Sequence, residues 1–332
     1  MSEPGGRAEL ITDRGEAAVG DDFFRSRPFL DAEGATHTLR IATDRSELLA
    51  PLIVRPIGAG PELDAISPYG YPGLVPGGRS SSRYAGGNAT AGGSGPANGV
   101  RPVDPAAIDF GATGLVSVFL RHALGEPPLA GARDRNVVQV ADPALPPKSR
   151  PSDRRQIRRN LETGYELELV RGAETTAEQR AGFLGLYEQT MRRTGAAVRY
   201  SFSAAYFDRI LEAPRTWLAL ARAPAGEPAA ASIAAVSDGY LHYYLSGSAD
   251  SRLGDSPMKN VVARLVEHST ELGLPLNLGG GISRGDALEE FKRGFANREQ
   301  PWRTSEIVCD REAYDRLSAG RESNGFFPAY RA

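Results

Sequence analysis

Cysteine and histidine are scarce in this sequence of 332 residues, which contains one cysteine and four histidines. The single cysteine, Cys309, excludes an internal disulfide bond and any metal site built from cysteine side chains. The histidines stand far apart, without the spacing that metal ligands show, at His37, His122, His242 and His268. We therefore predict that the protein has no metal site.

Long hydrophobic runs are also absent. No segment approaches the roughly 18 consecutive apolar residues that a membrane-spanning helix needs. The first 22 residues are polar and acidic, and they lack the apolar stretch of a signal peptide. Together with the single thiol, these absences predict a cytoplasmic protein.

An excess of charge of either sign is missing too, because 39 lysine and arginine residues nearly balance 41 aspartate and glutamate residues. The net charge of -2 excludes a protein that coats nucleic acid through its overall charge, but a local basic patch is compatible with it. Hydrophobic residues make up 41% and charged residues 24%, as in globular proteins. The length is typical of about two domains.

Changes in composition divide the chain. Residues 1–20 contain few apolar side chains and are predicted to form a disordered leader. A first domain is expected at 21–150, a second at 151–320 and a tail at 321–332. Within the first domain, residues 77–99 are rich in glycine and serine. They predict a flexible surface loop, with a substrate lid as the alternative.

Hydrophobic periodicity predicts an α+β fold with a mixed sheet. In the first domain it predicts strands at 38–41, 48–57 and 136–140, and a helix from Gly111 or Ala112 onward. In the second domain it predicts helices at 154–161, 176–193, 203–211, 257–272 and 287–295. It also predicts strands there at 165–170, 217–222, 229–236, 240–245, 274–278 and 302–308.

Five motifs share their order and spacing with a known family. They are Ser67–Gly73 (SPYGYPG), Arg154–Asn160 (RRQIRRN), Tyr240–Ser248 (YLHYYLSGS), Leu278–Gly281 (LGGG) and Phe291–Phe295 (FKRGF). With them, roughly residues 36–320 resemble the Fem-type (FemABX) aminoacyltransferase branch of the GNAT acyltransferase superfamily. Some members of the family bind tRNA through a long helical hairpin. This chain has no heptad run that could form such a hairpin, so it resembles the compact, arm-less members.

The resemblance implies two tandem GNAT-like domains, each with a mixed, mostly antiparallel sheet flanked by helices. Fem-type enzymes transfer an aminoacyl group from aminoacyl-tRNA to an amine, on a peptidoglycan precursor or on a small metabolite of a natural-product pathway. The expected partners are therefore aminoacyl-tRNA and a small-molecule amine, and no cofactor is expected. Two alternatives stay open: an acyl-CoA-dependent N-acyltransferase of the same fold, and a non-catalytic module that binds tRNA or a metabolite.

Lys292 is the first candidate for catalysis. It follows Phe291 on a short predicted helix, and the resemblance places it near the reacting ester. There an ammonium group neutralises phosphate or a developing oxyanion. The resemblance also implies that Phe291 stacks on the terminal adenine of tRNA, as aromatic side chains do on single-stranded RNA. The alternative is a solvent-exposed lysine beside a phenylalanine of the core.

His242 is the second candidate, on a strand where Tyr240, His242 and Tyr244 alternate on one face. It is predicted to accept the amine proton, because an unperturbed imidazole has a pKa of about 6.5. The neighbouring Tyr240 and Tyr244, together with Tyr69 and Tyr71 of the first domain, are predicted to bind the acceptor. The alternative is that these side chains only pack.

Four arginines, Arg154, Arg155, Arg158 and Arg159, have the spacing of residues on one arc of a helix. They are predicted to contact tRNA or substrate phosphate, and the alternative is an ordinary solvent-exposed helix face. Gly280, the middle of three glycines, is predicted to allow the donor close to the backbone or to form a tight turn.

A pyrophosphate-binding loop is missing. CoA-binding GNAT enzymes carry Arg/Gln-x-x-Gly-x-Gly/Ala between a central strand and the next helix, and the backbone amides there hold pyrophosphate. In this chain, residues 246–257 read SGSADSRLGDSP, and Pro257 removes one amide. The sequence therefore favours aminoacyl-tRNA over acyl-CoA as the donor.

Overall fold

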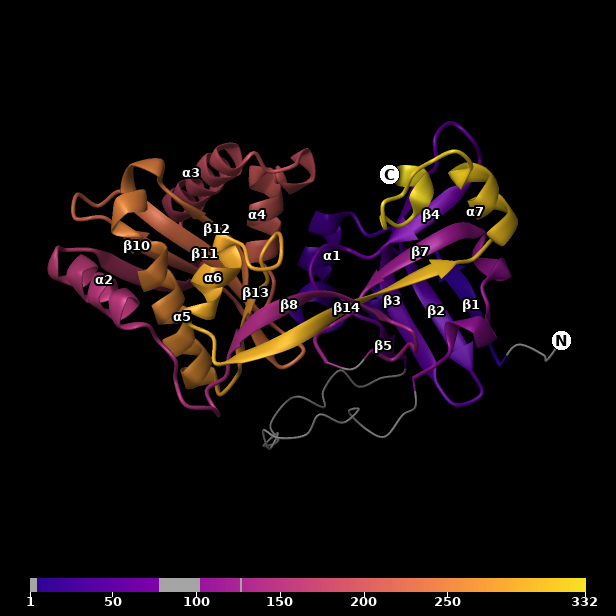
Figure 1. Ribbon diagram of the computed structural model, residues 1–332, viewed down its shortest axis with the longest axis horizontal. Coiled ribbons are helices and arrows are strands. Elements are labelled where there is room, and N and C mark those ends of the chain that lie inside the picture. Colours follow the sequence, from indigo (N-terminus) through magenta and orange to yellow (C-terminus); the bar gives the residue numbers. More distant parts are fainter. Residues whose placement is uncertain (1–4, 78–101, 126) are drawn as a thin grey trace. The chain divides into compact units, whose positions relative to one another are not determined.

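The computed structural model describes residues 5–77, 102–125 and 127–332. The chain forms two compact units: unit 1 comprises Met1–Arg135 and Pro301–Ala332, and unit 2 comprises Asn136–Gln300. Each unit has a mixed, mostly antiparallel sheet with helices, so the predicted α+β class is confirmed (Figure 1). No helix among the described residues is long and apolar enough to cross a membrane.

Unit 1 contains a sheet of strand order β6-β1-β2-β3-β4-β7-β14, with the short β5 beside β3. The pairs β1–β6 and β4–β7 are parallel and the others are antiparallel. Its elements are β1 Gly6–Ile11, α1 Arg27–Glu33, β2 His37–Thr43, β3 Glu47–Pro56, β4 Leu63–Ile66, β5 Val75–Pro76, β6 Ile108–Asp109, β7 Leu115–Arg121, β14 Arg298–Val308 and α7 Arg311–Ser318.

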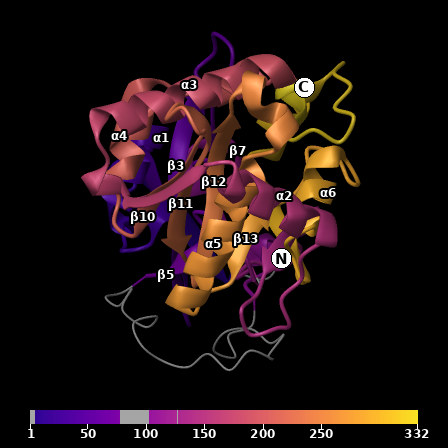
Figure 2. The same ribbon diagram turned by 90° about the vertical axis from the view of Figure 1, so that its left-hand side faces the viewer.

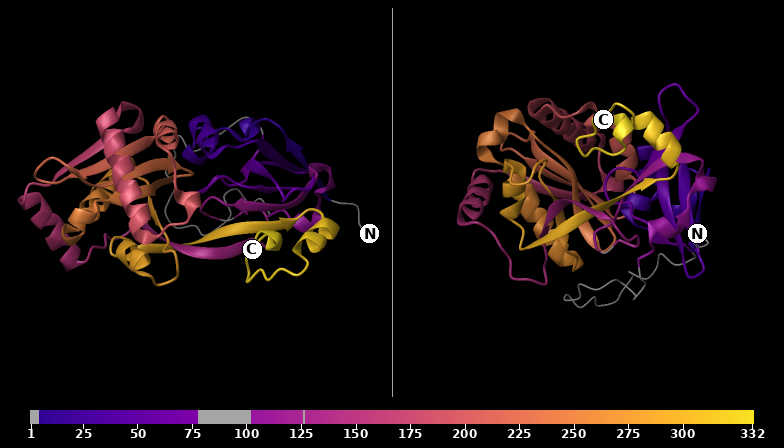
Figure 3. Two further views of the ribbon diagram at one scale, coloured as in Figure 1. Left: turned by 90° about the horizontal axis from the view of Figure 1, so that it is seen from above. Right: turned by 45° about the vertical axis from the view of Figure 1, so that its right-hand side comes forward.

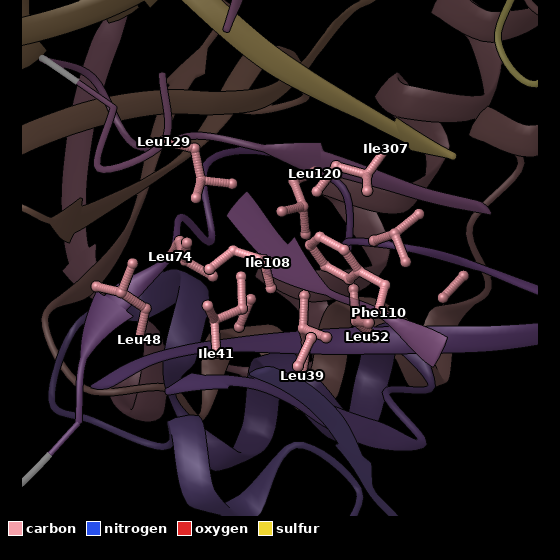
Figure 4. Close-up of a cluster of buried hydrophobic side chains, with 14 of the residues drawn as sticks. Leu39, Ile41, Leu48, Leu52, Leu74, Ile108, Phe110, Leu120, Leu129 and Ile307 are labelled. Carbon is pink, nitrogen blue, oxygen red and sulfur yellow. The ribbon is translucent and has the colours of Figure 1, made fainter. Parts of the chain in front are cut away.

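The core of unit 1 lies on one face of this sheet. Alternate residues of β2 and β3 point into it, because successive side chains of a strand point to opposite faces. Leu39, Ile41 and Leu52 are completely buried there, and Phe110 and Leu120 pack beside them (Figure 4).

Unit 2 contains a sheet of strand order β8-β13-β12-β11-β10-β9. The pair β12–β13 is parallel and the others are antiparallel. Its elements are β8 Arg133–Ala141, α2 Pro151–Glu162, β9 Glu166–Arg171, α3 Ala177–Thr194, α4 Ala204–Leu211, β10 Thr216–Arg222, β11 Pro228–Ser237, β12 Tyr240–Ser248, the 3₁₀ helix η8 Asp250–Asp255, α5 Met258–Leu272, β13 Leu276–Gly279 and α6 Ala287–Arg293.

Helices cover both faces of the unit 2 sheet. On one face α5 packs on β10 and β11 around a core that includes Leu241, Val261 and Leu276. On the other face α3 lies over β11 and β12 (Figure 3). Gly247 of β12 permits this approach, because a Cβ atom there would lie 2.4 Å from the backbone of Leu186 in α3.

The predicted domain limits need correction. The disordered leader expected at 1–20 is wrong for its described part, because β1 pairs with β2 and β6 and buries Ala8. Residues 136–150, expected in the first domain, belong to unit 2, and 301–320, expected in the second, belong to unit 1. These limits depend on strand pairing between distant segments, which composition does not reveal. Most of the predicted flexible loop, 77–99, lies outside the described residues.

The expected tail at 321–332 returns to unit 1. Tyr330 is 4% exposed and its hydroxyl lies 2.7 Å from Ser117 Oγ. Arg331 binds the buried carboxylate of Asp64, which Arg55 also contacts. These polar contacts hold the last residues against the sheet.

Most predicted elements of the second half are confirmed, but the helix expected from Gly111 or Ala112 is wrong. That segment contains β7, which carries β-branched Val116 and Val118. A short apolar run fits the helical and the extended period equally well, and strand pairing with β4 and β14 decides between them.

Candidate functional site

The site is built where two parallel strands of unit 2 separate. Strands β12 and β13 pair only through Leu241 with Leu276 and His242 with Asn277. Beyond these pairs β12 continues, and its register against β11 shifts by one residue at Tyr244. The shift is a β-bulge, which bends a strand and redirects its side chains. Beyond His242, β12 is therefore unpaired on its β13 side, and Lys292, near the end of α6, lies beside Tyr243 of β12.

Lys292 of α6 reaches this place. Its ammonium nitrogen donates a hydrogen bond of 2.7 Å to the carbonyl oxygen of Gly280, and it lies 6.0 Å from the centroid of the Tyr243 ring. Only 7% of Lys292 is exposed. Burial lowers the pKa of Lys292 from 10.5 to about 8, and the carboxylate of Asp286 opposes this shift.

The charge state of Lys292 follows from this pKa. At pH 7 the protonated form outnumbers the neutral form by about ten to one, because pH 7 is about one unit below the pKa. An ammonium has three N–H donors, and among the described residues Gly280 supplies the acceptor for one of them. The group is thus a buried cation with donors left for a substrate oxygen.

The three glycines before α6 are required by close packing. Gly279 has a positive φ of 76°, which favours glycine. A Cβ atom on Gly280 would lie 2.5 Å from Asn136 Nδ2 and 2.8 Å from the carbonyl oxygen of Val137. Asn136 Nδ2 also donates to the carbonyl oxygen of Gly281 at 2.9 Å. This geometry accounts for the tight turn; the contact of Gly280 with the donor stays a prediction.

Phe291 lies beside Lys292 in sequence but contacts a different group. Its ring is half-buried, packs against the apolar cluster under α5, and lies 5.7 Å from the ring of Phe295. The observed role of Phe291 is packing. Because part of its ring is exposed, stacking on a base of the donor stays a prediction.

His242 lies on the other face of β12 from Lys292. Its neighbours Leu241 and Tyr243 face the apolar cluster under α5, so His242 between them faces the opposite way. Both of its ring nitrogens are within hydrogen-bond distance of a partner, Ser237 and Asn277. Burial lowers the pKa of His242 to about 4. The structure thus does not bring the two predicted catalytic side chains face to face.

The four tyrosines predicted to bind the acceptor divide between the units. In unit 2, the Tyr240 hydroxyl donates to Gln300 Oε1 at 2.7 Å, and the Tyr244 hydroxyl lies 2.9 Å from that of Tyr206 in α4. Both tyrosines are half-buried, on strand β12 with His242. A pair of phenol groups can both donate and accept, so this end of β12 offers polar contacts for a ligand.

Tyr69 and Tyr71 belong to unit 1 and have local packing roles. The backbone N–H of Tyr69 donates to Glu33 Oε2 at 2.7 Å. The Tyr71 ring lies 5.5 Å from Phe24 and 5.8 Å from Trp302, edge to face in both cases. Both side chains are half-buried. Their role in binding an acceptor stays a prediction.

The predicted basic helix exists as α2, and all four of its arginines are exposed: Arg154, Arg155, Arg158 and Arg159. No described carboxylate forms an ion pair with any of them. The start of α2 lies beside α6, because Arg150 binds Glu290 and the Asp153 carboxylate lies against Gly294. The arginines therefore extend from the neighbourhood of Lys292 along one helix.

The loop between β12 and α5 has several of its backbone amides engaged within the protein. Backbone N–H groups there donate to protein oxygens at residues Ser248, Ala249, Asp250, Arg252 and Ser256. In the first turn of α5, the N–H groups of Lys259 and Asn260 bond to the carbonyl oxygens of Ser256 and Pro257. These amides are not available to a pyrophosphate.

Helix α2 also lies against this loop and the first turn of α5 (Figure 2). Asn160 Nδ2 donates to the Asp255 carbonyl oxygen at 2.9 Å and to Asn260 Oδ1 at 2.7 Å. Asp153 pairs with Lys259 at 2.9 Å. Helix α2 therefore lies against the segment between β12 and α5, in which the CoA-binding motif is missing.

Sequence reasoning missed Asn277, Asn136 and Tyr243. Asn277 is a polar residue inside the apolar strand LNLG. A buried amide needs hydrogen-bond partners, so a lone asparagine in such a strand indicates a polar site beside it. Tyr243 lies between two candidate residues of an alternating strand, so its position alone predicts only that it points away from them. Asn136 carries no local signal, since its partner Gly281 is 145 residues away in sequence. Among the described residues, no group of three histidine, cysteine or acidic side chains lies close enough to hold a metal ion.

Comparison with known proteins identifies the fold. Residues 147–293 match the family model described as Acetyltransferase (GNAT) domain. The chain is similar to the crystal structure of FemX, with a TM-score of 0.56 and 11% identity over 84% of this chain and 89% of that chain. Comparison with curated proteins finds no similar sequence.

Two further structures share the fold. The C-terminal domain of a putative lysylphosphatidylglycerol synthetase from Agrobacterium fabrum has a TM-score of 0.53 and 14% identity, over 90% of this chain and 92% of that chain. L-PGS from Bacillus licheniformis has a TM-score of 0.51 and 14% identity, over 86% and 87%. At these identities the similarity shows the fold alone, and the shared fold agrees with the predicted mixed α+β class.

Proposed function

We propose that this protein is an aminoacyl-tRNA-dependent N-aminoacyltransferase that forms an amide bond on a small amine, either a specialised metabolite or a peptidoglycan precursor. The observation that carries the proposal is the buried ammonium of Lys292, held at the separation of β12 and β13 by the Gly280 carbonyl. The GNAT match of residues 147–293 and the fold shared with FemX support an acyl transfer.

The chemistry needs few groups, because an aminoacyl ester is already activated. The amine nitrogen attacks the ester carbonyl carbon, a C–N bond forms, and the C–O bond to the ribose breaks. The proton lost by the amine ends on the ribose oxygen. The carbonyl oxygen becomes negative in between, and the free N–H donors of Lys292 stabilise it in a site of low polarity. Orientation of the two substrates supplies the rest of the rate.

The choice of donor rests on α2 and the loop before α5. Four exposed arginines without a described carboxylate partner suit the phosphates of a tRNA acceptor end. Several amides of the loop that would hold the pyrophosphate of CoA are engaged within the protein, and α2 lies against this loop. Both features favour aminoacyl-tRNA over acyl-CoA.

The test is donor choice by the purified full chain. It is incubated with a pool of charged, radiolabelled aminoacyl-tRNAs, and separately with acetyl-CoA, each with a mixture of candidate amines. We expect discharge of one tRNA species that depends on the amine. Release of free thiol without discharge of tRNA would overturn the proposal in favour of acyl-CoA. Binding of tRNA without turnover would indicate a non-catalytic module.

Two variants refine this test. Lys292→Met is expected to lower kcat about 100- to 1000-fold, as loss of an oxyanion donor does. Alanine at the four α2 arginines is expected to raise KM for tRNA more than tenfold, with a weaker salt dependence and kcat unchanged. The matched control replaces four exposed arginines on other helices, each paired with a carboxylate: Arg192, Arg209, Arg311 and Arg316.

A further inference from the structure

A chain of buried hydrogen bonds leads from His242 to the turn that holds Lys292. Asn277 Nδ2 lies 3.0 Å from His242 Nδ1, and Asn277 Oδ1 accepts the backbone N–H of Gly279 at 2.9 Å. The carbonyl of Gly280, in the second peptide group after the one that contains this amide, accepts the ammonium of Lys292. His242 and Asn277 are 2% and 1% exposed.

We propose that Asn277, oriented by His242, is a positioning residue that sets the direction of the Gly280 carbonyl and thereby the place of the Lys292 ammonium. The inference rests on the proposed function, in which that ammonium stabilises the oxyanion. In this role His242 acts through Asn277 and transfers no proton.

The direction of each hydrogen bond follows from the groups themselves. The Gly279 N–H can only donate, so the side-chain oxygen of Asn277 faces it and the NH₂ group faces His242. Nδ1 of His242 is then an unprotonated acceptor, and Nε2–H donates to the Ser237 carbonyl oxygen at 3.2 Å. Burial keeps the ring neutral at pH 7, although the carboxylate of Asp238 acts against this.

The turn needs such an anchor. Gly279, the last residue of β13, is in the left-handed region of backbone conformation. On one side Asn136 of β8 holds the carbonyl of Gly281, and on the other side Asn277 holds the amide of Gly279. A shift of about 1 Å in a positioned catalytic group lowers a rate up to about 100-fold. Loss of the Asn277 anchor is therefore expected to appear in kcat.

Two substitutions of His242 separate the positioning role from that of a base. In His242→Asn the amide oxygen stands near the position of Nδ1, so the acceptor for Asn277 is kept. In His242→Gln the longer side chain reaches the position of Nε2, so the donor to Ser237 is kept and the acceptor is lost. If His242 were a general base, both variants would lose that base. If the His242 ring only packed, both variants would lose the ring.

The kinetic experiment compares these variants with Asn277→Ala. We expect His242→Asn to keep kcat within about threefold of the parent. His242→Gln and Asn277→Ala are expected to lower kcat about 10- to 100-fold, with KM for both substrates near that of the parent. An equal loss of kcat in the two His242 variants would overturn the inference, since it would indicate a base or simple packing.

A second readout needs no substrate. The sequence contains three lysines, Lys148, Lys259 and Lys292, so protein labelled with ¹³C at lysine Cε yields three side-chain signals. Asp286 and the Tyr243 ring face Lys292 in the parent, and none of the substitutions changes them. We expect the titration midpoint of Lys292 to rise by at least half a pH unit in Asn277→Ala, as the ammonium gains solvent, and to stay near the parent value in His242→Asn. A midpoint unchanged in Asn277→Ala would refute the positioning role.

The two readouts keep the two proposals apart. If no donor gives turnover but the Lys292 midpoint moves only in Asn277→Ala, the positioning role stands and the proposed reaction fails. If turnover is found and neither kcat nor the midpoint responds to Asn277→Ala, the reaction stands and the positioning role fails. Circular dichroism checks folding, and if Asn277→Ala does not fold, the His242→Asn and His242→Gln pair decides.

Discussion

Replacement of Lys292 by methionine is expected to stabilise the folded protein at neutral pH. Methionine has a similar length and carries no charge, so it removes the ammonium without opening a large cavity. The side chain is 7% exposed, and burial lowers its pKa from 10.5 to about 8. A buried cation in this place therefore destabilises the fold.

The magnitude follows from the pKa. A shift of about 2.5 units corresponds to about 3 kcal/mol, because one unit is worth about 1.4 kcal/mol. The lost hydrogen bond to the Gly280 carbonyl offsets about 1 kcal/mol of this gain. We expect the variant to be more stable than the parent by about 2 kcal/mol at pH 7.

The sign of the pH dependence is part of the prediction. The unfolded chain holds the Lys292 proton up to pH 10.5 and the folded chain only up to about pH 8. Between these values the unfolded state binds more protons, so the stability of the parent rises with pH. The advantage of the variant is therefore complete below pH 8 and is lost as the pH rises toward 10.5.

The assay is urea unfolding of parent and variant at pH 7 and at pH 10, followed by circular dichroism. The reasoning is refuted if the variant is the less stable protein at pH 7, or if the difference between the two proteins does not change with pH. Lys259→Met is the control. Lys259 pairs with Asp153 at 2.9 Å, so its loss is expected to destabilise the protein at pH 7.

Three further outcomes are expected. The kcat of the parent is expected to fall above about pH 8, because Lys292 loses its proton there. It is expected to persist below pH 6, because His242 has a pKa of about 4 and stays neutral. A pH–rate profile checks both expectations. Arg331→Ala is expected to destabilise the protein by about 2 kcal/mol in urea unfolding, because it removes a partner of the buried carboxylate of Asp64. The control is Arg316→Ala, which removes an exposed ion pair and is expected to have little effect on stability. Gly247→Ala lowers the thermal midpoint by several degrees, because the new methyl group meets the backbone of α3, and unchanged stability would contradict that packing.

The sequence alone determined the parts of the fold that depend on local signals. Helix α3 starts at a capping box of Thr176 and Gln179, and glycine ends it. The hairpin of β11 and β12 turns at Asp238 and Gly239, which both have positive φ. The absence of a pyrophosphate loop and the Phe-Lys motif of α6 were also readable, because each is a short run of residue types with a definite backbone requirement.

Only the tertiary structure decided what depends on distant partners. β1 and β7 are strands because other strands pair with them, and the sequence of neither segment indicates which strand that is. The low pKa of Lys292 arises from burial, which a motif does not contain. His242 and Lys292 face opposite sides of β12, although each was a sound candidate by type. Residue type shows which chemistry a side chain can supply, and packing decides whether it is charged, paired and near the reaction.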